Sequence, residues 1–126
     1  APPCTAIAGP SDWFDGGVVT YSNEAKTDLL GVPGATLRRH GAVSRPVAIA
    51  MAEGALARAP AGLALAVTGI AGPGGGSPDK PVGTVWLAWA VAGQPANAVL
   101  LQLDGDRASI RLQTVRHALQ AGLTAL

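Results

Sequence analysis

"LALAVTGIAGPGGGSPDKPVGTVWLAWAVAG", residues 63–93, contains the pattern that decides the fold. Its first seven residues form a short apolar run, which is typical of a strand covered on both faces. A glycine-rich loop follows, and residues 82–93 and 97–105 then predict two strands joined by a turn at Gly93–Pro95. A strand that leads directly into glycines also indicates a ligand site, because ligands in open α/β sheets bind where strands end.

Helical patterns lie on both sides of this stretch in the sequence. The helix before it is expected to begin after the N-cap Ser44, to tolerate Pro46 in its first turn and to end before Pro60. The other expected elements are a strand over residues 13–22, a helix over Glu24–Leu30, a short helical piece over Thr36–His40 and a last helix from Asp106. Together they predict an α/β fold, a single three-layer-like domain over residues 1–126 with helices packed on a mixed sheet.

The composition excludes several classes of protein and site. A net charge of +1 with scattered arginines gives no basic stripe for nucleic acid. The single Cys4 allows no disulfide within the chain, and the two histidines have no metal-site spacing, so no metal or cofactor is expected. No apolar run reaches the ~20 residues of a membrane span, so we expect a cytoplasmic protein without a membrane partner. Trp86 and Trp89 fall on opposite faces of one strand and need cover, which favours a homo-oligomer.

The glycine loop is the first candidate site. Gly72, Gly74, Gly75 and Gly76 would let backbone N–H groups approach an anion closely. The loop is neither a Walker loop nor a dinucleotide fingerprint, because no Gly-Lys-Ser/Thr follows it and Pro73 interrupts it. A mobile surface loop is the alternative. Thr68 ends the preceding strand, where its hydroxyl could face a ligand or bond a neighbouring backbone group.

Lys26 is the second candidate, because it stands in the first turn of a helix that begins after Ser22. The helix dipole disfavours a cation there, and burial would lower the lysine pKa further. A neutral lysine can replace histidine as the base that activates a serine. We expect Tyr21 and the sheet edge to cover it. A solvated surface charge is the alternative, and spacing alone favours it.

Four stretches in order carry a family resemblance: "WFDGGVVTYSNEAKTDLLGV", "HGAVSRPVAIAMAEGA", "AVTGIAGPGGGSPDKPVGTVWLA" and "GDRASIR". From about Gly9 to its end, the chain resembles the C-terminal domain of the competence/damage-inducible CinA proteins. The resemblance implies an amidase that hydrolyses the carboxamide of nicotinamide mononucleotide to nicotinic acid mononucleotide and ammonia. This reaction is a salvage step in pyridine-nucleotide recycling.

The resemblance also implies a serine–lysine mechanism without a metal. Ser11, in "GPSDWF", takes the position of the family's nucleophile, and Tyr21 and Lys26, in "YSNEAK", those of its tyrosine and base. A small-molecule nucleotide is the expected partner. For Arg107 and Arg111 the alternative is that both are surface arginines. The expected substrate-binding residues are Thr68, Gly69, Gly72, Gly74, Gly75, Gly76, Arg107 and Arg111.

The chain departs from the family pattern near its start. Family members carry Glu-Ser-Cys-Thr-Gly-Gly upstream of the serine, and this sequence has no copy, so we expect the natural N-terminal segment to be missing. We therefore also expect none of the chemistry of the nucleotide-pyrophosphatase domain that precedes this one in longer relatives. A non-catalytic nucleotide-binding or regulatory domain is one alternative function, and a serine–lysine amidase acting on a different amide is another.

Overall fold

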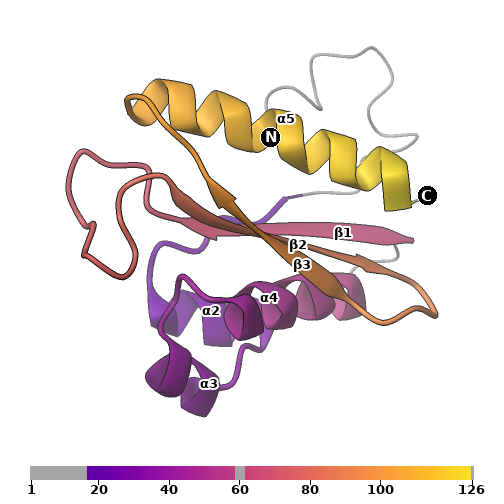
Figure 1. The fold of residues 1–126 in the computed structure, drawn as a ribbon. Coiled ribbons are helices and arrows are strands. Elements are labelled where there is room, and N and C mark those ends of the chain that lie inside the picture. The colour runs from indigo at the N-terminus through magenta and orange to yellow at the C-terminus, as the bar shows by residue number, and fades with distance from the viewer. Residues whose placement is uncertain (1–16, 59–61, 126) are drawn as a thin grey trace.

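The computed structural model describes residues 17–58 and 62–125. The elements, in chain order, are α2 (Asn23–Leu30), α3 (Gly34–His40), α4 (Arg45–Arg58), β1 (Leu63–Gly69), β2 (Thr84–Val91), β3 (Asn97–Gln102) and α5 (Arg107–Ala125). In Figure 1 the sheet forms a middle layer, with α5 on one face and α2, α3 and α4 on the other. The predicted α/β class with helices packed on a sheet is confirmed.

The sheet has the order β1-β2-β3, and both neighbouring pairs are antiparallel. Val67 pairs with Leu87 across the first ladder, and Ala88 pairs with Ala98 across the second. A mixed sheet was expected, but the strands in the described part of the chain are all antiparallel. Each follows the previous one directly along the chain, and such neighbours need no crossover helix.

Of the strand expected over residues 13–22, the structure describes residues 17–22, and these do not form a strand. Residues 17–21 are irregular, and the side chains of Val18 and Val19 are 56% and 72% exposed. Their β-branched side chains fit a pleated, half-buried surface, but these residues pair with none of β1, β2 and β3. Residues 13–16 lie outside the described residues.

The larger core lies between the sheet and α4. The strands present small side chains to this helix, so α4 can approach closely, and Val47 of α4 is fully buried. Burying a valine side chain contributes about 1.5–3 kcal/mol. Trp86 packs against the same cluster. The strand residues in this core are Ala66, Ala88, Ala90 and Ala98, and those of α4 are Val47, Ala48, Met51 and Ala52.

The smaller core lies between the sheet and α5. Leu87 and Ile110 are both 1% exposed, whereas Leu119 and Leu123 are 42% and 72% exposed, so the apolar spacing of the last helix does not produce a continuous buried face. Trp89 is partly buried and pairs with Leu65, whose methyl groups face α5 at Gly122. Helices thus cover both faces of the sheet, and a homo-oligomer stays a prediction. No helix within residues 17–58 and 62–125 is long and apolar enough to cross a membrane.

Candidate active site

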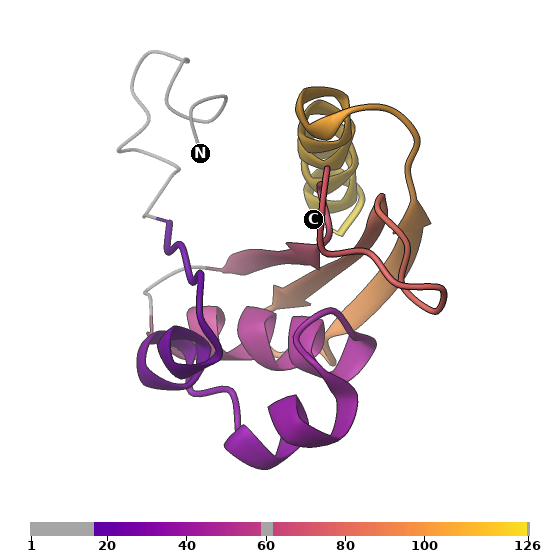
Figure 2. The same cartoon turned by 90° about the vertical axis from the view of Figure 1, so that its left-hand side faces the viewer.

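The starts of α2, α4 and α5 and the glycine loop, residues 70–83, gather at one end of the molecule. This is the left-hand end in Figure 1, and Figure 2 views it directly. β1 ends there, and the loop leads from it into β2. Each helix N-terminus carries partial positive charge and free backbone N–H groups. An anion is therefore favoured at this end.

Lys26 lies in the first part of α2, which is short and capped at both ends. The Ser22 side chain accepts a hydrogen bond from the Ala25 amide at 3.0 Å, and Gly31 ends the helix with a left-handed φ of 71°. Lys26 and Leu30 are the two buried residues of α2. They stand four positions apart, so they share the inward face.

The Lys26 side chain is 6% exposed, and its Nζ donates a hydrogen bond to the Thr20 carbonyl oxygen at 3.1 Å. Burial lowers the pKa of this amine, because a charged ammonium loses hydration inside the protein. No carboxylate within the described ranges forms a hydrogen bond to it that would hold the charged form. Lys26 is therefore a buried amine in this structure and not the solvated surface charge that was the alternative.

We expect from the sequence that Tyr21 covers Lys26, but in the structure it does not. Its side chain is 94% exposed, next to the irregular residues that precede α2. The prediction was wrong because it assumed that residues 17–21 form a strand, which would turn alternate side chains toward the helix layer. Lys26 is buried instead because its place on α2 turns it toward the inside with Leu30.

Thr68 uses its hydroxyl within the fold. Its Oγ1 donates to the Ala42 carbonyl oxygen at 2.8 Å, and the residue is 8% exposed. Of the two alternatives, the hydroxyl thus bonds a backbone group and does not face a ligand. Gly69 follows, where a Cβ would lie 2.8 Å from a Val85 methyl carbon. A side chain at this position would force β1 and β2 apart.

The glycines of the loop differ in their surroundings. A Cβ at Gly72 would lie 2.7 Å from a Val82 methyl carbon, and one at Gly76 would lie 2.8 Å from the Val82 amide nitrogen. Among the described residues, a Cβ at Gly74 would meet nothing within 4 Å, and one at Gly75 would meet Ile70 at 3.7 Å. Gly72 and Gly76 therefore pack the loop against its own return, whereas Gly74 and Gly75 are open.

The two arginines at the start of α5 have different environments. Arg107 donates from Nη1 to the Gly72 carbonyl oxygen at 3.0 Å, so the structure brings this residue and the glycine loop together. Arg111, one turn later on the same helix, is exposed. Both residues are exposed, and Arg111 is the one of the two whose side chain forms no hydrogen bond to another described residue. Ser11, the expected nucleophile, lies outside the described residues.

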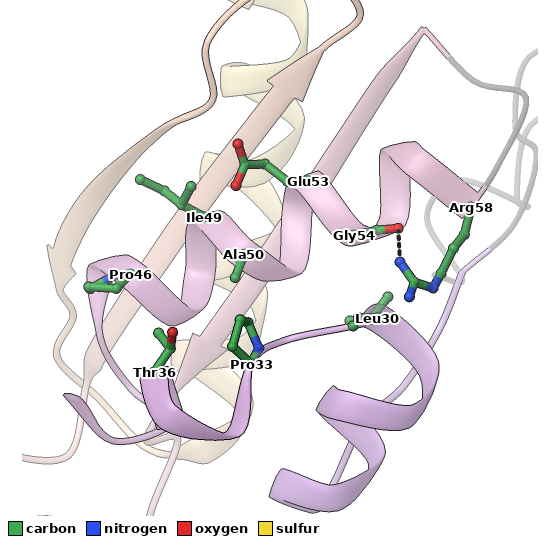
Figure 3. Close-up of a pocket in the computed structure, with 10 residues that line it drawn as sticks. Leu30, Pro33, Thr36, Pro46, Ile49, Ala50, Glu53, Gly54 and Arg58 are labelled. Atoms are coloured by element: carbon green, nitrogen blue, oxygen red, sulfur yellow. Dashed lines mark hydrogen bonds between the residues drawn. The ribbon is translucent and has the colours of Figure 1, made fainter. Parts of the chain in front are cut away.

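The hollow in Figure 3 is not the candidate site. It has a volume of about 510 Å³ and lies between α4 and the segment from the end of α2 to α3. Its lining includes Leu30, Pro33 and Ile49, and Arg58 at one end donates to the Gly54 carbonyl oxygen at 3.2 Å. Neither this hollow nor a second one beside α2 and α3 contains any of the expected site residues. We therefore define the candidate site by the residues that carry reactive chemistry and not by these two open grooves.

Lys80 was not singled out from the sequence, and the structure gives it a place at this end of the molecule. Its Nζ donates to the His40 carbonyl oxygen at 3.1 Å. The only sequence signal is that Lys80 closes the glycine loop in a chain with two lysines. Within residues 17–58 and 62–125 no three His, Cys, Asp or Glu side chains lie where they could hold a metal ion.

Comparisons with known proteins agree with the resemblance. The family model of the CinA C-terminal domain matches residues 1–126. A CinA-like protein of Akkermansia muciniphila is 55% identical over 119 residues, which are 94% of this chain and 28% of that protein. The nicotinamide-nucleotide amidohydrolase PncC of Escherichia coli is 53% identical over 116 residues, 92% of this chain and 70% of that enzyme.

The solved structures agree as well. The competence/damage-inducible protein CihA of Agrobacterium tumefaciens superposes with a TM-score of 0.92 at 51% identity, over 95% of this chain and 73% of that one. A CinA superfamily protein of Escherichia coli gives a TM-score of 0.92 at 37% identity, over 99% of this chain and 72% of that one. The chain thus spans about seven-tenths of these shorter relatives and less than a third of the Akkermansia protein. On the family model and these identities, the chain belongs to the CinA C-terminal domain family.

Proposed function

We propose that the chain is a nicotinamide-nucleotide amidohydrolase, which converts nicotinamide mononucleotide and water to nicotinic acid mononucleotide and ammonia. The proposal rests on the 53% identity to PncC, whose name states this activity. The buried Lys26 at the start of α2, which forms no hydrogen bond to a carboxylate of residues 17–58 or 62–125, is the structural observation that supports it.

In the first half of the reaction, the neutral Lys26 amine accepts the proton of Ser11. The serine oxygen attacks the carboxamide carbon, and the carbonyl oxygen becomes an oxyanion. Backbone N–H groups near Ser11 or in the glycine loop stabilise it, and such donors contribute roughly 3 kcal/mol each where measured. The lysine then returns its proton to the amide nitrogen, and the carbon–nitrogen bond breaks to release ammonia.

In the second half, water attacks the ester that the substrate has formed with Ser11. Lys26 accepts a proton from this water, and the ester bond breaks. The products are the carboxylate of nicotinic acid mononucleotide and the restored serine. Lys26 thus acts as base and then as acid in both halves, which requires an amine whose pKa lies near the working pH.

The substrate phosphate is expected to lie against the open part of the glycine loop. Gly74 and Gly75 leave space for it, and the helix starts at this end of the molecule supply a favourable field. Arg111 is exposed on the first turns of α5 and can approach a phosphate there. Arg107 holds the loop through its bond to the Gly72 carbonyl oxygen, and its remaining N–H donors lie beside the same glycines.

The test is product formation from nicotinamide mononucleotide by the parent chain and by Ser11→Ala. We expect equal amounts of ammonia and nicotinic acid mononucleotide from the parent, and at least a ~10²-fold lower rate from the variant with nucleotide binding retained. Binding without turnover in the parent would favour the regulatory domain instead. Turnover of the variant within tenfold of the parent would exclude Ser11 as the nucleophile. Faster hydrolysis of another amide would redefine the substrate.

A further inference from the structure

The turn between α3 and α4 is fixed by three side chains that bond to three successive carbonyl oxygens. The His40 oxygen accepts from Lys80 Nζ at 3.1 Å, and the Gly41 oxygen accepts from Ser44 Oγ at 2.8 Å. The Ala42 oxygen accepts from Thr68 Oγ1 at 2.8 Å. Thr68 and Lys80 stand on either side of the glycines of the loop, so both ends of the loop are attached to this one turn.

Gly41 gives the turn its shape. Its φ is 78°, a region that residues with a Cβ rarely adopt, and its amide donates to the Leu37 carbonyl oxygen at 2.9 Å. A Cβ here would lie 3.3 Å from Lys80 Nζ, and no other described residue beyond its chain neighbours comes within 4 Å. The lysine therefore packs directly over the glycine.

Lys80 also closes the returning part of the loop through its backbone. Its carbonyl oxygen accepts from the Ser77 amide at 3.0 Å, and its amide donates to Ser77 Oγ at 3.2 Å. Its ammonium meets the last carbonyl of α3, where the helix dipole favours a cation. Lys80 thus connects the hydrogen-bonded turn of residues 77–80 to the end of α3, which lies 40 residues earlier in the chain.

The glycine content of the loop makes this attachment important. Fixing a residue's backbone on binding costs conformational entropy, and glycine loses more freedom than any other residue. A loop ordered before the ligand arrives avoids that cost during binding. A further attachment of the loop is the bond from Arg107 to Gly72, the first of the loop glycines, whereas Lys80 follows the last of them before the return.

We propose that Lys80 is a positioning residue. Through the His40 carbonyl oxygen it holds the returning part of the glycine loop in the conformation that receives the substrate phosphate. The inference rests on the proposed function, in which that phosphate lies against the loop. Lys80 itself contacts His40 and Ser77 and does not contact the substrate.

The experiment compares Lys80→Met with Lys80→Arg and His40→Ala in the whole chain. His40→Ala is the matched control, because it removes the neighbouring side chain and keeps the carbonyl that accepts the bond. The first measurement is hydrogen exchange of the Ser77 amide in the free protein, and the second is the separate determination of kcat and KM for nicotinamide mononucleotide. Thermal unfolding of each variant checks that it is folded.

For Lys80→Met we expect Ser77 exchange to be about tenfold faster and KM about tenfold higher, with kcat within about twofold of the parent. A tenfold change corresponds to about 1.4 kcal/mol, which is close to the ~1.5 kcal/mol at the lower end for a hydrogen bond to a charged group. Lys80→Arg can still donate to the carbonyl and should restore most of both values. His40→Ala should match the parent.

Unchanged Ser77 exchange in Lys80→Met would overturn the proposal, whatever happens to KM. A higher KM with unchanged exchange would mean that Lys80 contacts the substrate itself. If the parent does not hydrolyse the nucleotide, the proposed function fails, but the exchange measurement still decides whether Lys80 holds the loop. The two failures are therefore distinguishable.

Discussion

The side-chain nitrogen of Lys26 lies 3.1 Å from the carbonyl oxygen of Thr20 and donates a hydrogen bond to it. A carbonyl accepts from a neutral amine as well as from an ammonium, so this bond orients Lys26 without fixing its charge. A carboxylate in the same place would hold the charged form and raise the pKa. Burial is the largest cause acting on this amine, and it lowers the pKa.

The first prediction concerns the pH dependence of the reaction. Because neutral Lys26 is the active form, kcat/KM should rise with pH through the lowered pKa and then level off. Lys26→Arg should lose about 10²–10⁴-fold in kcat/KM at every pH, since arginine keeps its proton. Lys80→Arg is the matched control and should keep the rising limb. A near-normal rate for Lys26→Arg would show that the residue only supplies positive charge.

The second prediction concerns stability. The unfolded chain binds a proton at Lys26 up to about pH 10.4, whereas the folded chain releases it at a lower pH. Stability attributable to this group therefore rises with pH between the lowered pKa and about 10.4, and the penalty is fully present below that window. Lys26→Met keeps the length of the side chain and should melt at a higher temperature than the parent at pH 7. Melting curves from pH 7 to 10 should show the difference shrinking, and a constant or growing difference would argue against a buried cation.

The third prediction concerns the phosphate. Arg111→Ala should raise KM for the nucleotide by at least about tenfold, the scale of a lost hydrogen bond to a charged group. The same variant should act on nicotinamide riboside, which lacks the phosphate, as slowly as the parent does. Arg116→Ala removes an exposed arginine further along α5 and serves as the control. An equal loss on both substrates would mean that Arg111 does not read the phosphate.

The fourth prediction concerns how α2 is held. A Cβ at Gly54 of α4 would overlap the Leu30 carbonyl oxygen at the end of α2, so Gly54→Ala must push the two helices apart. Overpacking of this kind costs about 1–3 kcal/mol. Because α2 carries Lys26, activity should fall as well. Gly62→Ala is the control, since a Cβ there meets nothing within 4 Å. Equal unfolding free energies for the two variants would show that α2 is not packed as described.

Local signals predicted most of the elements correctly. Ser22, Gly31 and Ser44 act through their own backbone neighbourhood, and the helix bounds that they predicted are confirmed to within about one residue. The strands around the glycine loop were predicted by the apolar runs and are confirmed. Such features depend on residues a few positions apart, which the sequence displays directly.

The features that were missed depend on contacts between distant residues. A backbone partner for Thr68 was one of the two alternatives, but the sequence did not indicate which backbone group accepts. The Thr68 and Lys80 bonds join residues 26 and 40 positions apart, and periodicity carries no information about such pairs. Val18 and Val19 have strand-forming side chains, but no described strand pairs with them. Tyr21 is exposed for the same reason, because residues 17–21 are irregular and do not form a paired strand.

The titration of the Lys26 side chain itself would decide whether this residue can be the base. The chain has two lysines, so the ¹³Cε signals of Lys26 and Lys80 can be followed by NMR and assigned with Lys26→Arg. We predict that the Lys26 signal titrates below the usual lysine value of about 10.4, because burial lowers this pKa, and at the same pH as the rising limb of kcat/KM. A Lys26 signal that titrates near 10.4 would mean that the amine is charged in the resting enzyme, and Lys26 could not be the general base.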